Sequence, residues 1–295
     1  MKKLIFTGTA TAIVTPFSDG SIDYSAFDRL LQRQLDAGVA AIVVTGTTGE
    51  ACTLTRSEKE ALWRHAVEYL GGRTAVIAGV GSNSTAEALN QAITAQDCGV
   101  DALLAVTPYY NKCSQSGLLR HYTLLADAVS LPLIVYHVPS RTGIDLRPET
   151  FAELSRHERI CGIKDASGNI SYTAKLLAAC GSDCTVWCGN DDQTVASMAL
   201  GAKGVISVLS NVRPEATVRM TAACLRGDFQ TASDIQLCCL PLIEALFSEG
   251  NPIPVKAALA AMGLCREELR LPLTPLAAEK RNVLLARLLE CPEKR

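Results

Sequence analysis

The sequence alternates between short apolar runs and longer amphipathic stretches, and this alternation restricts the fold more than any other feature. The runs are rich in Val, Ile, Leu and Ala, and most end in glycine or polar residues. Continuous apolar runs are typical of strands that are buried on both faces of a parallel sheet. The eight expected strands occupy residues 9–17, 39–50, 74–83, 101–110, 131–140, 160–169, 184–191 and 203–211.

The stretches between these runs have the length and the pattern of helices. Apolar residues recur there at every third or fourth position. Several begin with a possible N-terminal cap, such as Ser57 with Glu60 and Ser84 with Glu87. The clearest helices are expected over residues 24–38, 57–70, 85–99 and 116–130.

Eight strand–helix repeats in a chain of 295 residues predict an α/β fold, a (β/α)8 TIM barrel. A doubly wound parallel sheet is the alternative. After about Val212 no further strand pattern appears, and the remaining chain has a helical pattern interrupted by NPIPVK. We therefore predict a catalytic barrel over residues 1–225 and a small C-terminal helical domain over residues 226–295.

Composition excludes several classes of partner. The formal net charge is -2, with 48% hydrophobic and 20% charged residues, as in an ordinary globular protein. Nucleic-acid and anionic-membrane partners are not expected, because both usually require a basic patch. MKKLIFTGTATAIVTPF has two lysines before apolar residues, as a signal peptide does, but Thr7, Gly8, Thr9 and Thr11 interrupt it. No run is long enough to span a membrane, and we expect a cytoplasmic protein.

The twelve cysteines are scattered along the chain. Many lie inside apolar segments, for example Cys224, Cys238 and Cys239. Cys180, Cys184 and Cys188 are spaced by four residues, but Gly181 and Ser182 are expected to break a helix there, and no CxxC pair accompanies them. We therefore predict buried free thiols, with disulfides or a metal site as the alternative.

Polar side chains gather where the expected strands end, which is the catalytic end of a TIM barrel. Lys164 ends the run ICGIK. Burial at that point would disfavour its charged form, and a neutral amine forms Schiff bases with carbonyl compounds. The alternative is a lysine paired with a carboxylate of another strand; Asp165 is not that carboxylate, because adjacent strand residues point to opposite faces. Tyr136 and Tyr110 could transfer protons, although either tyrosine could instead be a core residue. The GTTGE segment could hold a small carboxylate, or it could be a plain turn after a strand.

Several motifs, taken together and in order, give the chain a family resemblance. It resembles the pyruvate-dependent class I aldolases related to N-acetylneuraminate lyase, and within them the branch that condenses pyruvate with L-aspartate 4-semialdehyde for diaminopimelate and lysine synthesis. The resemblance extends from FTGTATAIVTPF to NPIPVK and LRLPLTP. The motifs that carry it are GTTGE at 46–50, VTPYYN at 106–111, YHVPSRTG at 136–143, GIKDASGN at 162–169 and GVISV at 204–208.

The resemblance implies a role for each candidate residue. Lys164 would form the imine with pyruvate, and Tyr136 would transfer protons beside it. Thr48 would link Tyr136 to Tyr110, which would come from a neighbouring subunit of a homotetramer built from tight dimers. Thr47 and Thr48 would hold the pyruvate carboxylate, Arg141 would bind the carboxylate of the semialdehyde, and backbone groups of Gly189 and Ile206 would line the pocket. No metal or organic cofactor is implied.

Two other functions share some of these residues. A sialic-acid or sugar-acid aldolase would use Lys164, Tyr136 and a similar turn. Thr48 and Arg141 favour the synthase branch, because a polyhydroxylated substrate has no carboxylate for Arg141. A non-catalytic binding relative would be expected to lack at least one of the candidate residues Lys164, Tyr136, Thr48, Tyr110 and Arg141.

The chain departs from the family pattern in two places. His137 stands where the family usually has Asn; it could be a pH-sensitive neighbour of Tyr136, but we favour a side chain that faces the helices and is bonded there. Many relatives also bind lysine as a feedback inhibitor. Arg56 and Lys59 replace histidines of the lysine-sensitive members, and their charge should weaken that binding. The matching allosteric positions are Ala51, Arg56, Lys59, Asn83, Glu87 and Tyr109.

Overall fold

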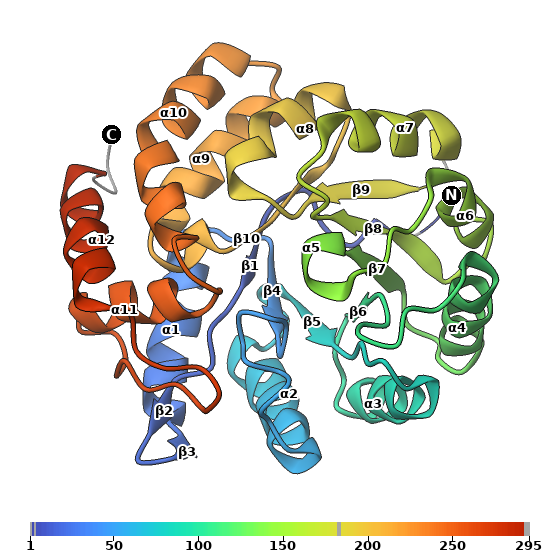
Figure 1. Cartoon of the computed structure of the whole chain (residues 1–295), viewed down its shortest axis with the longest axis horizontal. Helices are drawn as coiled ribbons and strands as arrows, with labels where there is room; N and C mark the ends of the chain where they lie inside the picture. Colours follow the sequence, from blue (N-terminus) through green and yellow to red (C-terminus); the bar gives the residue numbers. More distant parts are fainter. Residues whose placement is uncertain (1, 3, 182–183, 292–295) are drawn as a thin grey trace.

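A closed barrel of eight parallel strands forms the centre of the molecule in this computed structural model, which describes residue 2 and residues 4–181 and 184–291 (Figure 1). Each strand pairs with its sequence neighbour in the barrel, and β1 closes the ring by pairing with β10 and β4. The predicted TIM barrel is confirmed, and the doubly wound sheet is wrong. The strands are β1 (Gly8–Ala12), β4 (Ala41–Val44), β5 (Ala75–Gly79), β6 (Ala102–Val106), β7 (Leu133–His137), β8 (Ile160–Asp165), β9 (Thr185–Cys188) and β10 (Gly204–Ser207).

Helices surround the barrel (Figure 1). The cap predicted at Ser57 is wrong: Thr55 caps this helix, in a reciprocal capping box with Glu58 that satisfies two backbone N–H groups. The cap at Ser84 is confirmed, since its hydroxyl accepts from the Glu87 N–H at 3.4 Å. The surrounding helices are α1 (Tyr24–Asp36), α2 (Arg56–Leu70), α3 (Thr85–Asp97), α4 (Gln115–Asp127), α6 (Pro148–Leu154), α7 (Ile170–Cys180), α8 (Thr194–Leu200) and α9 (Pro214–Leu225).

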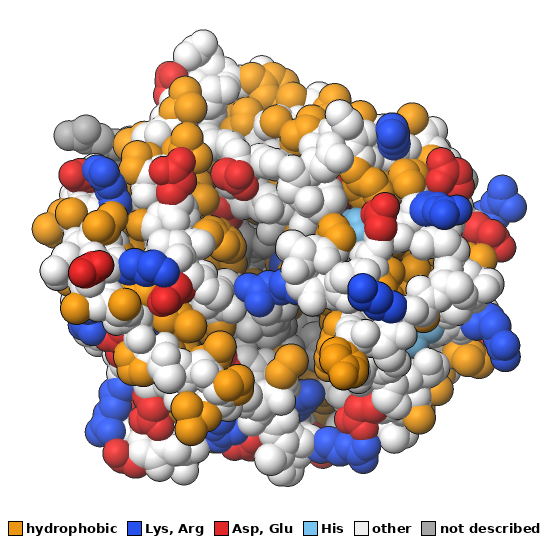
Figure 2. Space-filling view, viewed as in Figure 1, with side chains coloured by type: hydrophobic (Ala, Val, Ile, Leu, Met, Phe, Trp, Pro, Cys, Tyr) orange, Lys and Arg blue, Asp and Glu red, His pale blue; other side chains and the backbone are white. Residues whose placement is uncertain are grey.

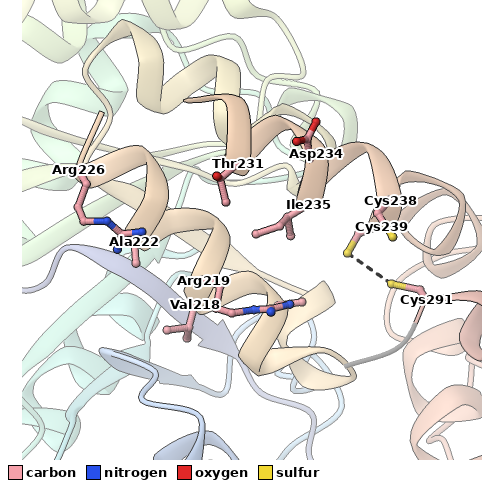
Figure 3. A pocket seen from close by; sticks show the side chains of 11 residues that line it. Val218, Arg219, Ala222, Arg226, Thr231, Asp234, Ile235, Cys238, Cys239 and Cys291 are labelled. Atoms are coloured by element: carbon pink, nitrogen blue, oxygen red, sulfur yellow. Dashed lines mark hydrogen bonds between the residues drawn. The ribbon is translucent and has the colours of Figure 1, made fainter. Parts of the chain in front are cut away.

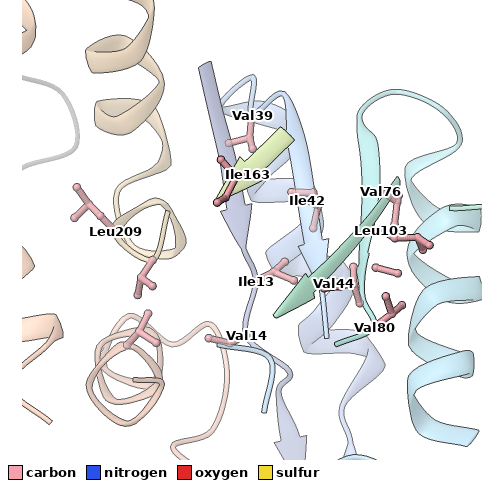
Figure 4. Close-up of a cluster of buried hydrophobic side chains, with 14 of the residues drawn as sticks. Ile13, Val14, Val39, Ile42, Val44, Val76, Val80, Leu103, Ile163 and Leu209 are labelled. Carbon is pink, nitrogen blue, oxygen red and sulfur yellow. The ribbon is translucent and has the colours of Figure 1, made fainter. Parts of the chain in front are cut away.

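Two apolar layers bury both faces of the strands, which explains their continuous apolar sequence. An inner cluster fills the barrel and includes Ile77, Ile134 and Trp187. An outer cluster lies between strands and helices and includes Val44 and Ile163 (Figure 4). The inner cluster makes the barrel a packed core and leaves room for a cavity at its mouth.

Some predicted strands are longer than the observed ones. The run over residues 9–17 forms a strand only to Ala12, and Ile13 and Val14 continue as loop into the outer cluster. Apolar sequence alone does not separate a strand from a buried loop. The sequence also did not predict the hairpin of β2 (Phe17–Ser18) and β3 (Ser21–Ile22), the short helix α5 (Pro139–Thr142), or the 3-10 turns η2 (Asp191–Gln193) and η3 (Leu209–Asn211).

The C-terminal part of the chain is helical, as predicted, and the described residues after Ser207 contain no strand. It comprises α10 (Phe229–Leu246), α11 (Ile253–Ala261) and α12 (Ala278–Glu290), drawn in orange to red beside α9 in Figure 1. Helix α10 packs on both α9 and α12. The domain boundary between residues 225 and 226 stays a prediction.

The cysteines only partly follow the prediction. Cys224 and Cys239 are buried free thiols, but Cys238, also on α10, is exposed. Helix α7 ends at Cys180 and Gly181 follows with a φ of 56°; Ser182 lies outside the described residues. The part of the chain that the structure describes contains no group of three or more His, Cys, Asp or Glu side chains arranged to hold a metal ion. No helix in this described part of the chain has the length and apolar character needed to cross a membrane.

Candidate active site

A cavity of about 180 Å³ lies at the carboxyl end of the barrel strands. In the space-filling view the surface is hollowed near its centre, and Lys and Arg side chains border the hollow (Figure 2). The cavity brings together most of the residues predicted from the sequence. They are Thr47, Thr48, Tyr136, Arg141, Lys164 and Gly189.

Lys164 lies in the wall of this cavity with only 6% of its surface exposed. Strand β8 places it next to Tyr136 of β7 in the parallel register, and its Nζ is 4.3 Å from the centre of the Tyr136 ring. Asp165 points to the other face, where its carboxylate accepts from the Thr173 hydroxyl at 2.6 Å. Within the described residues no carboxylate forms an ion pair with Lys164. The structure therefore does not support the alternative in which Lys164 serves as half of a salt bridge.

Gly189 makes room for the lysine side chain. A Cβ atom at this position would lie 3.0 Å from the Lys164 Cε and 2.6 Å from the Ala166 Cβ. Both distances are shorter than ordinary van der Waals contacts, so any larger residue would displace the amine.

The loop after β4 presents Thr47 and Thr48 to the cavity. Glu50 lies in the middle of this loop, which covers residues 45–55, and has a positive φ of 56°, which is unfavourable for a residue with a side chain. Its carboxylate is fully buried and bonded to the Lys256 Nζ at 2.6 Å and to the Arg270 N–H at 3.1 Å. The C-terminal segment thus holds the middle of the loop, two residues after Thr48.

Asn251 is a site residue that the sequence analysis did not identify. Its side-chain N–H donates to the Thr48 hydroxyl at 2.9 Å, and its main-chain carbonyl oxygen accepts from the Arg141 guanidinium at 3.3 Å. It therefore contacts two candidate residues from different loops. The sequence signal was the motif NPIPVK, but an asparagine before a proline is also an ordinary turn signal.

Two predicted residues do not line the cavity of their own chain. Tyr110 lies on the loop after β6 with 89% of its surface exposed. Ile206 is fully buried in the inner cluster, and Val208, two residues later, lines the cavity instead. The buried Asp191 holds this wall, because its carboxylate accepts from the N–H groups of Val208 and Leu209, both at 2.9 Å. Burial nevertheless raises the pKa of Asp191.

His137 faces the helices, as predicted, and is completely buried. Its ring lies 4.8 Å from the Tyr172 ring, and its Nε2 is 3.6 Å from the Asp145 carboxylate. Neither ring nitrogen has a hydrogen-bond partner among the described residues, so the bond expected there is not seen. Burial lowers the pKa of His137, although Asp165 and Asp145 oppose this shift, and a neutral imidazole follows.

A second cavity, of about 470 Å³, adjoins the first and shares Thr47, Tyr136 and Arg141 with it. Arg56 does not line it but pairs with Glu87. Asn83 is also absent from the lining, and its carbonyl oxygen accepts from the Asn111 amide at 2.9 Å. Of the six allosteric candidates, those that line this cavity are Ala51, Lys59, Glu87 and Tyr109.

Comparison with known proteins gives a consistent result. Residues 5–290 match the dihydrodipicolinate synthetase family. A 4-hydroxy-tetrahydrodipicolinate synthase from Exiguobacterium sp. (strain ATCC BAA-1283 / AT1b) is 49% identical over 96% of this chain and 97% of its own length. A solved structure reported for the first monomeric dihydrodipicolinate synthase variant has a TM-score of 0.96 at 41% identity, covering 97% of each chain. That of the Cyanidioschyzon merolae enzyme with lysine bound has a TM-score of 0.95 at 37% identity, covering 98% of this chain and 99% of that one.

Proposed function

The chain belongs to the dihydrodipicolinate synthetase family and catalyses the Schiff-base condensation of pyruvate with L-aspartate 4-semialdehyde, and from this premise we propose how its residues share the reaction. The synthase branch predicted from the sequence is confirmed, and the sugar-acid aldolase is not favoured. The reaction belongs to diaminopimelate and lysine biosynthesis.

Lys164 is the proposed nucleophile, and its burial without a carboxylate partner among the described residues is the observation that supports this role most directly. Its amine attacks the keto carbon of pyruvate, and loss of water gives the imine. Loss of a methyl proton then gives an enamine, whose carbon attacks the aldehyde. The substrate amine closes the ring at the imine carbon and releases Lys164.

Hydroxyl groups of the cavity are the proposed proton carriers. Tyr136 lies next to Lys164 in the barrel and borders the same cavity as Thr48. We assign the proton transfers at the imine to Tyr136, linked through Thr48 to Tyr110. Tyr110 is the one member of this relay that is exposed on its own chain.

Carboxylate recognition divides between two sides of the cavity. Thr47 and Thr48 hold the pyruvate carboxylate close to Lys164, and Gly189 is a further predicted contact, whereas Val208 takes the place predicted for Ile206. Arg141 lines both cavities, so its guanidinium can receive the semialdehyde carboxylate in a bidentate geometry.

Acceptor specificity tests this assignment. We expect pyruvate to be consumed with the semialdehyde and not with N-acetylmannosamine. Arg141→Met should raise the KM for the semialdehyde about tenfold or more while the KM for pyruvate changes little, because a charge-assisted hydrogen bond to the acceptor is lost. Equal increases in both KM values would contradict the proposed role of Arg141.

We expect Asn251→Ala to reduce kcat by about tenfold, because the hydroxyl of Thr48 loses the bond that orients it. Steady-state kinetics of Thr48→Val, Asn251→Ala and the double variant test whether Asn251 acts through Thr48. The double variant should then be no slower than Thr48→Val. Fully additive losses would show that Asn251 acts by another route.

A homotetramer built from tight dimers is our proposal for the assembly, because the relay needs Tyr110 from a neighbour. The exposure of Tyr110, on a loop where its φ is 73°, supports an intersubunit role. Sedimentation of the purified enzyme tests the proposal, and a fully active monomer would contradict it.

We also propose a cytoplasmic location, since free thiols such as Cys52 and Cys238 persist in a reducing compartment.

Weak or absent inhibition by L-lysine is expected. The two carboxylates of the second cavity are already paired, Glu50 with Lys256 and Glu87 with Arg56, and Lys59 adds a further basic group. A cationic ligand would therefore meet repulsion without an unpaired carboxylate. Initial rates with and without lysine test this, and Arg56→His/Lys59→His is the matched variant that should gain sensitivity. Half-maximal inhibition of the unaltered enzyme by sub-millimolar lysine would contradict the prediction.

A further inference from the structure

Two cysteines from different elements meet beside a cavity that is separate from the catalytic one. Cys239 lies on α10, Cys291 directly follows α12, and their Sγ atoms are 3.4 Å apart (Figure 3). The cavity has a volume of about 600 Å³, lies against α9 and α10, and has no described lining residue in common with the catalytic cavity. It gives small molecules a route to two sulfurs that are otherwise buried.

The electrostatic surroundings of the two thiols differ. Arg213 holds the end of α12, where its guanidinium donates to the carbonyl oxygens of Cys291 and Leu288. The hydrogen bond with Cys239 and the Arg213 guanidinium lower the pKa of Cys291, although burial opposes this shift. The same hydrogen bond and burial raise the pKa of Cys239. The two shifts have opposite directions, so Cys291 is the thiol of the pair that loses its proton more readily.

We propose that Cys291 and Cys239 form a reversible disulfide when the enzyme meets a hydroperoxide. The Cys291 thiolate attacks one peroxide oxygen and breaks the O–O bond, which gives a sulfenic acid, while the other oxygen leaves as hydroxide and takes a proton from solvent. The Cys239 sulfur then attacks the Cys291 sulfur, the S–S bond forms, and the sulfenic oxygen leaves as water with the proton of Cys239. With hydrogen peroxide, one peroxide is reduced to two waters while two thiols are oxidised to one disulfide.

The bond would restrain the part of the chain that supports the catalytic loop. Residues 239–291 include Asn251, which contacts Thr48, and Lys256 and Arg270, which both contact Glu50. Closing this loop removes conformations from the unfolded chain, so the oxidised protein should resist unfolding more strongly. We expect its melting temperature to rise by roughly 5 °C.

Peptide mapping of the full-length enzyme tests the disulfide. The protein is treated with hydrogen peroxide, alkylated with N-ethylmaleimide and digested with trypsin without reduction. Trypsin places Cys238 and Cys239 together in peptide 227–256 and Cys291 in peptide 288–294. We expect these two peptides to become linked, and to separate again after treatment with a thiol reductant.

Cys238→Ser is the matched control, because Cys238 is the exposed neighbour of Cys239 on the same helix. This variant should still form the link and keep the rise in melting temperature, whereas Cys239→Ser should lose both. A link that disappears in Cys238→Ser would overturn the pairing. Two results on the unaltered protein would also overturn the proposal. One is oxidation of Cys291 beyond the sulfenic acid, and the other is full alkylation of Cys291 after peroxide treatment.

Discussion

Lys164→Ala is expected to lower kcat by about a thousandfold or more, because the imine that activates pyruvate can no longer form. Lys164 is buried in the cavity wall beside Tyr136, and it is the one lysine among the described residues that lines this cavity. Without the amine, pyruvate would have to react as a free enolate. Lys164→Arg should fail similarly, since guanidinium stays protonated and is a poor nucleophile.

The measurement combines rate assays with chemical trapping. Reduction by borohydride in the presence of pyruvate should attach the three pyruvate carbons to Lys164 of the unaltered enzyme and to no residue of the variants. Lys203→Ala is the matched control, because Lys203 is exposed on the loop before β10, and it should keep normal rates. More than about a tenth of the normal kcat in Lys164→Ala would rule out an essential imine at this position.

Lys256→Met should destabilise the protein by about 3–5 kcal/mol, because it leaves a buried carboxylate without its cation. Neither Glu50 nor Lys256 has any exposed side-chain surface, and their charged atoms are 2.6 Å apart. The Lys256 Nζ also lies 4.2 Å from the centre of the Phe17 ring. Since Glu50 lies on the same loop as Thr47 and Thr48, two residues after Thr48, the variant should also lose activity at temperatures where it stays folded.

Urea unfolding of three variants separates this pair from ordinary lysine effects. Lys256→Met/Glu50→Gln should recover part of the lost stability, because a neutral amide is less costly to bury than an unpaired carboxylate. Lys280→Met removes a surface ion pair with Glu249, where 43% of the lysine side chain is exposed, and should cost less than about 1 kcal/mol. A Lys256→Met protein as stable as Lys280→Met would show that the buried pair does not hold the loop.

Sequence periodicity predicted the barrel because each strand must be buried on both faces and each helix on one. It predicted element boundaries less well. The cap at Thr55 was missed because Ser57 and Glu60 also fit the capping pattern, and only the backbone path distinguishes the two. The strand expected over residues 9–17 was too long. Ile13 and Val14 are apolar because they pack in the outer cluster, but strand pairing has already ended before them.

The site residues, too, were only partly predicted from the sequence. Lys164, Tyr136, Thr48 and Arg141 were found from strand ends and motifs, since parallel strands bring their carboxyl ends to one mouth. Asn251 and Lys256 were not, because their partners Thr48 and Glu50 lie about two hundred residues earlier in the chain. Contacts between such distant segments have no periodic signature, and their sequence looks like a turn and a helix.

The sequence by itself determined the repeating α/β architecture, the lysine at a strand end and the membership in a family of imine-forming enzymes. These depend on local patterns of burial and on residue order, which a single chain displays directly. Only the tertiary structure decided that Lys164 has no carboxylate partner among the described residues, that the C-terminal segment holds the catalytic loop, and that Cys239 meets Cys291. Each of these depends on distances between residues remote in sequence, and packing sets those distances.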